Sequence, residues 1–101
     1  MQIYASSREY VTIPVVGVDA TGTRIDLSGD AVAIAAVLGD ADATPEEADW
    51  LTASWAAAGQ ATILIGPDGD VELTAGLYQM FVRVTDNPEA PVLRSGALRV
   101  T

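Results

Sequence analysis

The feature that most constrains this chain is a short motif, Leu73-x-x-Gly76-x-Tyr78, placed at the start of its longest strand-like segment. Over residues 77–85, Tyr78, Met80, Val82 and Val84 alternate with a second set of side chains, as in a β-strand with two different faces. Leucine, glycine and tyrosine at this spacing are typical of a tyrosine corner, in which the hydroxyl hydrogen-bonds to backbone a few residues upstream at a bend of a β-sandwich. We therefore expect Tyr78 to be buried and to have a structural role.

The rest of the chain reads as a series of short strands separated by turn residues. Such strands, with turn signals about every 8–12 residues, are the pattern of an all-β sandwich. We predict a single immunoglobulin-like or fibronectin-like β-sandwich of seven to eight short strands with one short helical turn. The predicted strands are residues 9–18, 23–27, 31–38, 50–55, 61–65, 71–73, 77–85 and 95–101.

Two of these segments carry more detailed expectations. Pro14 lies within residues 9–18 and cannot donate to a strand ladder, which favours an edge position or a bulge. Residues 31–38 are alanine-rich and would suit a helix, but eight residues between two glycines is the length of a strand. We predict a strand there, with Val32, Ile34, Ala36 and Leu38 facing inward.

The chain length of 101 residues and its hydrophobic share of 50% suit one domain with one core. Because regular strand patterning starts only near Glu9, we predict an N-terminal arm over residues 1–8 and a sandwich over residues 9–101. Ile3 and Tyr4 would then be apolar anchors of the arm on a neighbouring subunit.

Charge and residue usage exclude several classes of function. The formal net charge is −9, with 14 acidic against 5 basic residues, and such a surface repels phosphate backbones. The chain has neither cysteine nor histidine, so it lacks thiol nucleophiles, disulfides, Cys or His metal ligands and the imidazole base of hydrolytic triads. It also lacks a phosphate-binding glycine loop and a Gly-x-Ser-x-Gly motif. We predict no enzymatic activity, no cofactor and no nucleic-acid partner.

Two acidic clusters are candidate cation sites. The first combines Asp40, Asp42, Glu46, Glu47 and Asp49, but Pro45 and Leu51 stand where a calcium loop needs its turn glycine and its bidentate glutamate. A solvated loop with a helical turn, begun by Thr44 as N-cap, is the competing interpretation and the one we adopt.

The second acidic cluster follows the turn Pro67-Asp68-Gly69. Asp68, Asp70 and Glu72 alternate along the chain there, as carboxylates do on the solvated face of a strand. We therefore expect no metal at either cluster.

Trp50 and Trp55 are the candidate aromatic contacts. If residues 50–55 form one strand, side chains five positions apart point to opposite faces. One tryptophan would then lie in the core and the other near the surface or at a partner interface, although a glycan-stacking platform is an alternative.

The C-terminal half of the chain resembles small virion proteins of tailed phages, especially actinobacteriophages. The resemblance lies in Leu-x-x-Gly-x-Tyr at 73–78, in the strand through Val82-Arg83-Val84-Thr85 with residues 86–92 after it, and in Ser95-Gly96-Ala97-Leu98-Arg99-Val100-Thr101. Asp49-Trp50 and Trp55 resemble the same group, so the likeness covers about half of the chain.

The resemblance implies a non-enzymatic structural virion protein, present in many copies on the capsid surface or at the head–tail junction as a decoration or connector accessory. Its partners would be other virion proteins, such as major capsid or connector subunits. The alternative is a glycan- or receptor-binding immunoglobulin-like module of a tail or cell-surface protein.

The sequence also carries an expectation for localisation. Residues 1–10 lack the cationic start and apolar block of a signal peptide, and the longest apolar run, residues 31–38, is far below the roughly 20 residues that span a bilayer. We expect a protein made in the host cytoplasm, with no membrane partner, that ends in the virion.

Overall fold

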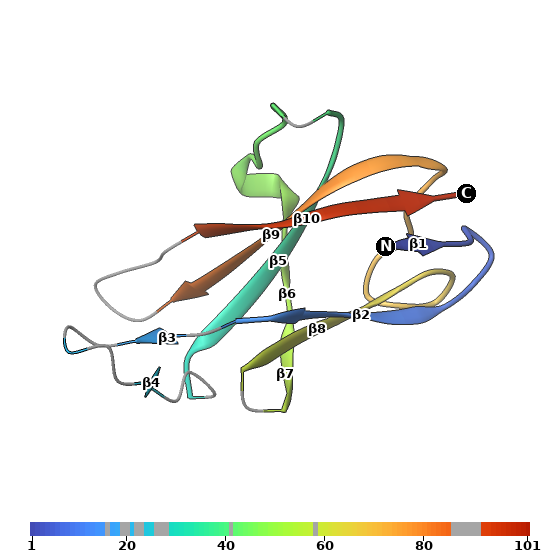
Figure 1. Ribbon diagram of the computed structural model, residues 1–101. Helices are drawn as coiled ribbons and strands as arrows, with labels where there is room; N and C mark the ends of the chain where they lie inside the picture. The colour runs from blue at the N-terminus through green and yellow to red at the C-terminus, as the bar shows by residue number, and fades with distance from the viewer. Residues whose placement is uncertain are drawn as a thin grey trace.

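The computed structural model describes residues 1–15, 17–18, 21, 24–25, 29–40, 42–57, 59–85 and 92–101. Eight strands of this part form two packed sheets, of five and three strands, and one 3-10 turn, η1 (Glu47–Asp49), lies between two strands of the larger sheet (Figure 1). A ribbon of β3 (Gly17–Val18) and β4 (Arg24–Ile25) extends from one end. The chain is thus all-β and sandwich-like, as predicted. The eight strands are β1 (Gln2–Ile3), β2 (Glu9–Pro14), β5 (Ala31–Leu38), β6 (Trp50–Thr52), β7 (Ser54–Ala57), β8 (Gln60–Ile65), β9 (Gly76–Thr85) and β10 (Val92–Val100).

The larger sheet has the order β1-β10-β9-β5-β6. Its neighbours are antiparallel except for β1, which runs parallel to the end of β10 through the pairs Gln2↔Arg99 and Ile3↔Val100. β9 lies in the middle and pairs along its length with β5 and β10. This central place explains why the segment with the clearest alternation in the sequence is also the longest strand.

The smaller sheet has the order β2-β8-β7. Pro14 ends β2, which is an edge strand, so the missing N–H of proline costs no ladder hydrogen bond. The edge position predicted for Pro14 is therefore confirmed.

The core lies between the two sheets and follows the period of two along the strands. Val11 and Ile13 of β2, Val32 and Ile34 of β5, and Leu98 of β10 are all buried there. The remaining buried members of this core are Ile3, Val15, Ala61, Ile63, Ile65, Tyr78, Met80, Val82, Val84 and Val100.

Residues 50–55 are not one strand, and the prediction is wrong on this point. β6 pairs with β5 in the larger sheet, whereas β7 pairs with β8 in the smaller one. Between them Ala53 donates its N–H to the Val32 carbonyl at 3.0 Å, which holds the crossing chain against β5. A strand that changes sheet has no single alternation, so the opposite-face argument for the tryptophans no longer applies.

The first residues of the chain belong to the sandwich and do not form a free arm. β1 adds to the larger sheet, Ile3 is only 7% exposed within the core, and the Ala5 N–H donates to the Thr101 carbonyl at 2.8 Å. The arm over residues 1–8 and the anchor role of Ile3 are therefore corrected. A strand of two residues is too short to show alternation, so no pattern in the sequence indicates β1.

Three local expectations also change. Residues 31–38 form a strand, as predicted, but Leu38 is 61% exposed and Ala36 only half-buried, because the end of β5 projects beyond the core. The expected strand over residues 71–73 reduces to a single bridge between Ile65 and Val71. The closing strand begins at Val92 and not at residue 95.

Some predicted residues lie outside the part that the structure describes. These are residues 23, 26 and 27 of the predicted strand 23–27, residue 16 of the strand 9–18, and residues 86–91.

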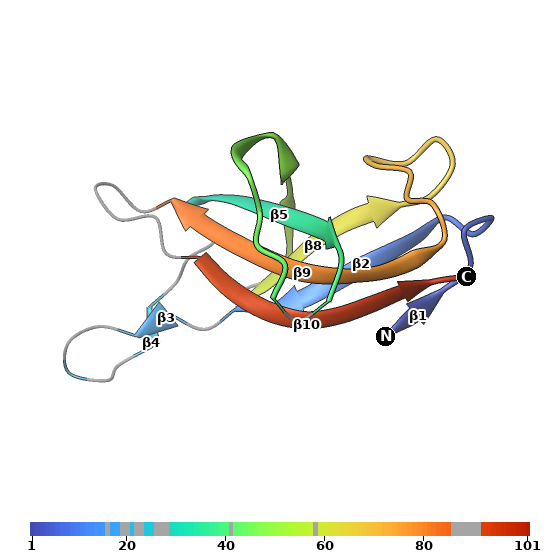
Figure 2. The same cartoon turned by 90° about the horizontal axis from the view of Figure 1, so that it is seen from above.

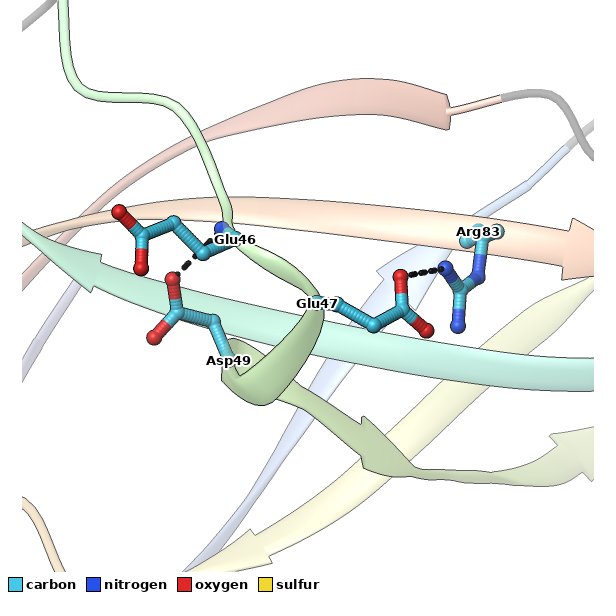
Figure 3. A network of polar contacts seen from close by, with 4 residues as sticks. All are labelled: Glu46, Glu47, Asp49 and Arg83. Atoms are coloured by element: carbon cyan, nitrogen blue, oxygen red, sulfur yellow. Dashed lines mark hydrogen bonds and ion pairs between the residues drawn. The ribbon is translucent and has the colours of Figure 1, made fainter.

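The helical turn exists but begins two residues later than predicted. Glu46, and not Thr44, precedes η1, and its N–H donates to the Asp49 carboxylate at 2.8 Å while the Asp49 N–H donates to the Glu46 carbonyl at 3.0 Å. This reciprocal pair does the work of a capping box, with an aspartate in place of the expected glutamate. Figure 3 shows the hydrogen bond that the Glu46 backbone N–H donates to the Asp49 carboxylate.

Candidate interaction surfaces

Tyr78 has the geometry that its motif predicts. Its ring is 5% exposed, and its hydroxyl donates to the Thr74 carbonyl at 2.8 Å. Leu73 packs against the core beside it. Gly76 has a backbone φ of 158°, which favours glycine there, whereas the atom nearest to a Cβ at this position, Leu38 Cδ1 at 2.6 Å, belongs to an exposed side chain that can move aside. The hydroxyl is therefore bonded within the fold.

The outer face of the larger sheet is covered by its own chain. The strap, which we define as residues 42–49, leads from β5 to β6 and passes over β9 toward β10 (Figure 2). Beneath it Ala35, Gln79 and Phe81 are buried although they point away from the main core. The sandwich therefore has a small second layer of packing on this face.

Two arginines fasten the strap to the sheet. Arg94 of β10 donates to the Ala43 carbonyl at 3.1 Å and to Gln79 Oε1 at 3.4 Å, and its guanidinium lies 4.9 Å from the centre of the Phe81 ring. Arg83 of β9 pairs with Glu47 at 3.3 Å (Figure 3) and lies 4.6 Å from the centre of the Trp50 ring. Nothing in the sequence pattern marks Arg94 or Phe81 as contact residues, because the arginine faces the aromatic ring only after β10 has paired with β9.

The four residues expected to contact partners differ widely in accessibility. Ile3 is in the core, while Tyr4 is 66% exposed. Trp50 is half-buried under Arg83, and Trp55 is half-buried against the core with its Nε1–H donated to the Asp30 carbonyl at 2.9 Å. Only Tyr4 of the four is largely open to a partner, and the two tryptophans do not form a common platform.

The acidic residues of the first cluster are used singly. Asp40 accepts from the Asp42 N–H at 3.0 Å, Asp49 bonds to Glu46 and Glu47 faces Arg83. Within the described residues no three carboxylate, histidine or cysteine side chains are grouped so that they could hold a metal ion.

In the second cluster, Asp70 closes the loop that follows β8. Its carboxylate accepts from the Leu64 N–H at 2.9 Å, and its own N–H donates to the Leu64 carbonyl at 2.8 Å. Asp68 takes a positive φ of 61° at the turn, a conformation that aspartate tolerates better than most residues. Asp70 thus stabilises the loop after β8, and Asp68 occupies a turn position.

The outer face of the smaller sheet carries a row of hydroxyls. Thr12, Thr62 and Ser54 stand side by side across three strands, and the two threonine hydroxyls are 3.3 Å apart. A hollow of about 600 Å³ opens on this face. Its lining is Tyr10, Thr12, Ser54, Ala56, Thr62 and Asp70.

Comparison with protein-family models, with curated proteins and with solved structures finds no match to this chain. Among the described residues, no helix is long and apolar enough to cross a membrane.

Proposed function

We propose that this chain is a non-enzymatic, immunoglobulin-like structural module that joins the particle of a tailed phage through protein–protein contacts. Strand order supports the immunoglobulin-like assignment. In that fold one sheet holds strands G, F and C with C′ beside them, the other holds B, E and D, and a tyrosine corner lies near the start of F. The orders β10-β9-β5-β6 and β2-β8-β7, with Tyr78 near the start of β9, correspond to this arrangement.

One observation carries the structural role: the polar side chains of the tyrosine corner, the strap and the loop after β8 bond within the fold, while exposed apolar side chains lie along strands and at their ends. Arg94, Tyr78 and Asp70 all bond internally. The exposed large apolar residues are Met1, Tyr4, Tyr10, Leu38, Val92 and Leu93. Surfaces of this kind suit contacts with other proteins. The proposal that the larger assembly is a phage particle rests on the sequence resemblance at residues 73–101.

The test is whether purified particles contain the chain. Particles are banded on a density gradient, and an antibody to this chain is used for blotting and for immunogold imaging. The proposal expects the chain to co-migrate with particles at a fixed copy number and to label the head or the head–tail junction. Particles that lack the chain would refute the role.

A second candidate, glycan binding, is favoured by the hollow on the smaller sheet. Its volume lies within the roughly 300–1,000 Å³ of small-molecule sites, and it offers an exposed tyrosine ring beside a hydroxyl row. Tyr10 is 69% exposed, so its ring is free to stack on a sugar. A glycan array should then give signals that Tyr10→Ala abolishes and Tyr4→Ala leaves unchanged, and no glycan signal for the unaltered chain rejects this candidate.

A further inference from the structure

The sandwich is open along one side, where the edge of β2 faces the edge of β10. A hollow of about 300 Å³ lies in this opening, between the two sheets. Core side chains reach its wall, and Met1 stands at one end. Besides Met1, the wall includes Val11, Ile13, Pro14, Met80, Gly96 and Leu98.

Gly96 leaves this space unfilled. It pairs with Met80, which points into the core, so a side chain at position 96 would point the same way. A Cβ built there meets no atom within 4 Å, whereas at Gly76 it would be only 2.6 Å from a neighbour. The core therefore lacks a side chain at this point of its wall.

The edge of β10 beside the hollow offers backbone groups for pairing. Arg99 and Thr101 donate their N–H groups to the carbonyls of Met1 and Ile3, both at 3.0 Å, so the backbone groups of these alternate residues face β1. By the same alternation, the backbone N–H and carbonyl of Ala97 face this edge. Its carbonyl accepts from the Met1 amino group at 3.4 Å, while the described residues contain no acceptor for its N–H in line with β1.

The opposite edge is less suited to pairing. The Val15 N–H donates to the Gly59 carbonyl at 2.7 Å, on the β8 side of β2. By alternation, the backbone groups of Pro14 and Thr12 face the opposite way, toward the opening. Proline has no N–H to offer there, which is a common way to blunt a strand edge. A segment entering the opening would therefore pair with β10.

From these features we propose that the opening binds an extended, uncharged segment of a partner polypeptide, paired to β10 at Ala97 with one apolar side chain over Gly96. The inference deepens the proposed structural role and rests on it. All described side chains that line the hollow are uncharged, and the one charged group beside it, the Met1 amino group, is bonded to the Ala97 carbonyl. A charged side chain seated over Gly96 would therefore lose its solvation with no side-chain partner in exchange. The new strand would continue the line of β1 along the same edge, in the manner of β-strand addition.

The experiment uses the isotopically labelled full chain and a capped seven-residue peptide of alternating valine and serine. The control peptide has aspartate in place of each valine. We expect the valine peptide to shift the Ala97 and Leu98 amide signals, to protect the Ala97 N–H from hydrogen exchange, and to bind at least tenfold more tightly than the control. Equal binding of the two peptides, or no shift near Ala97, overturns the proposal.

Two pairs of variants locate the site. Ala97→Pro removes the edge donor without touching the ladder to β9 and should weaken binding at least tenfold, whereas Ala97→Ser should bind within twofold of the unaltered chain. Pro14→Asp places a carboxylate on the rim, and Gln60→Asp places one on the cross-strand partner outside the hollow. Only the first should weaken binding, and equal effects within either pair contradict the site.

Analytical sedimentation of the unaltered chain tests whether a second copy of the same chain fills the opening instead. A dimer that Ala97→Pro abolishes would show that a second copy fills the opening, and this would overturn the assignment to a different partner. The experiments distinguish an error in the proposed peptide-binding site at Ala97 from an error in the proposed structural role. If peptide binding is absent while particles contain the chain, only the strand site is wrong; if the peptide binds and particles lack the chain, the phage role is wrong.

Discussion

Arg94 joins three parts of the molecule through a single side chain. It holds the strap by the Ala43 carbonyl, meets Gln79 on the neighbouring strand and covers the Phe81 ring. Its planar guanidinium can make directed hydrogen bonds and stack on a ring at the same time, which a lysine ammonium cannot. The second packing layer on the larger sheet therefore depends on the residue type, not merely on a positive charge.

Arg94→Lys should lower the free energy of unfolding by about 1–3 kcal/mol, because it loses the bond to Ala43 and most of the ring contact. Urea denaturation followed by tryptophan fluorescence measures the change. Arg99→Lys, on an exposed position of the same strand, is the matched control and should change stability by less than about 0.5 kcal/mol. Equal effects of the two variants would show that Arg94 does not hold the strap.

Tyr78→Phe should cost roughly 1–3 kcal/mol, because the Thr74 carbonyl loses its donor in a partly buried site. Thermal and chemical denaturation of this variant are compared with those of Tyr10→Phe, whose hydroxyl is on an exposed ring. A neutral Tyr78→Phe would mean that the hydroxyl bond contributes nothing to the corner.

At the scale of the element, the strands that the sequence predicts well are those with a single, uninterrupted environment. β9 has one core face throughout, so alternation locates it, and the tyrosine corner fixes where it starts. β6 and β7 lie in different sheets, and no periodicity within residues 50–55 marks the crossing at Ala53. The strap contacts are equally hidden, because they join residues 36 and 51 positions apart that meet only after the sheet has formed. The acidic loop and its turn could be predicted, but their docking onto Arg83 and Arg94 could not.

β1 is short, yet we expect it to matter for stability. Ile3 lies in the core, so Ile3→Ala should lower the free energy of unfolding by about 2–5 kcal/mol, and the milder Ile3→Val by about 0.5–1.5 kcal/mol. Chemical denaturation of both variants gives the values, with the exposed neighbour Tyr4→Ala as the control expected near zero. If Ile3→Ala were as stable as Tyr4→Ala, the first residues would not be part of the folded sandwich.

At the scale of the whole molecule, negative charge dominates the surface. With a formal charge of −9 on 101 residues and one ion pair among the described side chains, the folded protein repels itself. Screening shortens the reach of these charges from about 30 Å at 0.01 M salt to about 3 Å at 1 M. The apolar packing between the two sheets must therefore outweigh a net repulsion between negative charges.

Sodium chloride should accordingly raise the melting temperature between 0.01 M and 1 M. The increase is measured by circular dichroism at fixed pH, with Glu47→Gln and Glu9→Gln compared at low salt. Glu9→Gln removes a carboxylate for which the described residues offer no cation and should stabilise, whereas Glu47→Gln gives up the Arg83 pair and should gain less. A melting temperature that falls with salt would show that attraction between charges outweighs repulsion.

The parallel pairing of β1 with β10 brings together residues from opposite ends of the described chain: the amino group of Met1 meets the carbonyl of Ala97, 96 positions later. During synthesis on a ribosome, β10 is the last of the described strands to emerge, and until it does Leu98 and Val100 cannot complete the core. The nascent chain must wait with Ile3 unburied and one side of β9 unpaired. Contacts so distant in sequence form slowly. The last step of core formation, the docking of β10 and β1, therefore takes place only after β10 has been translated.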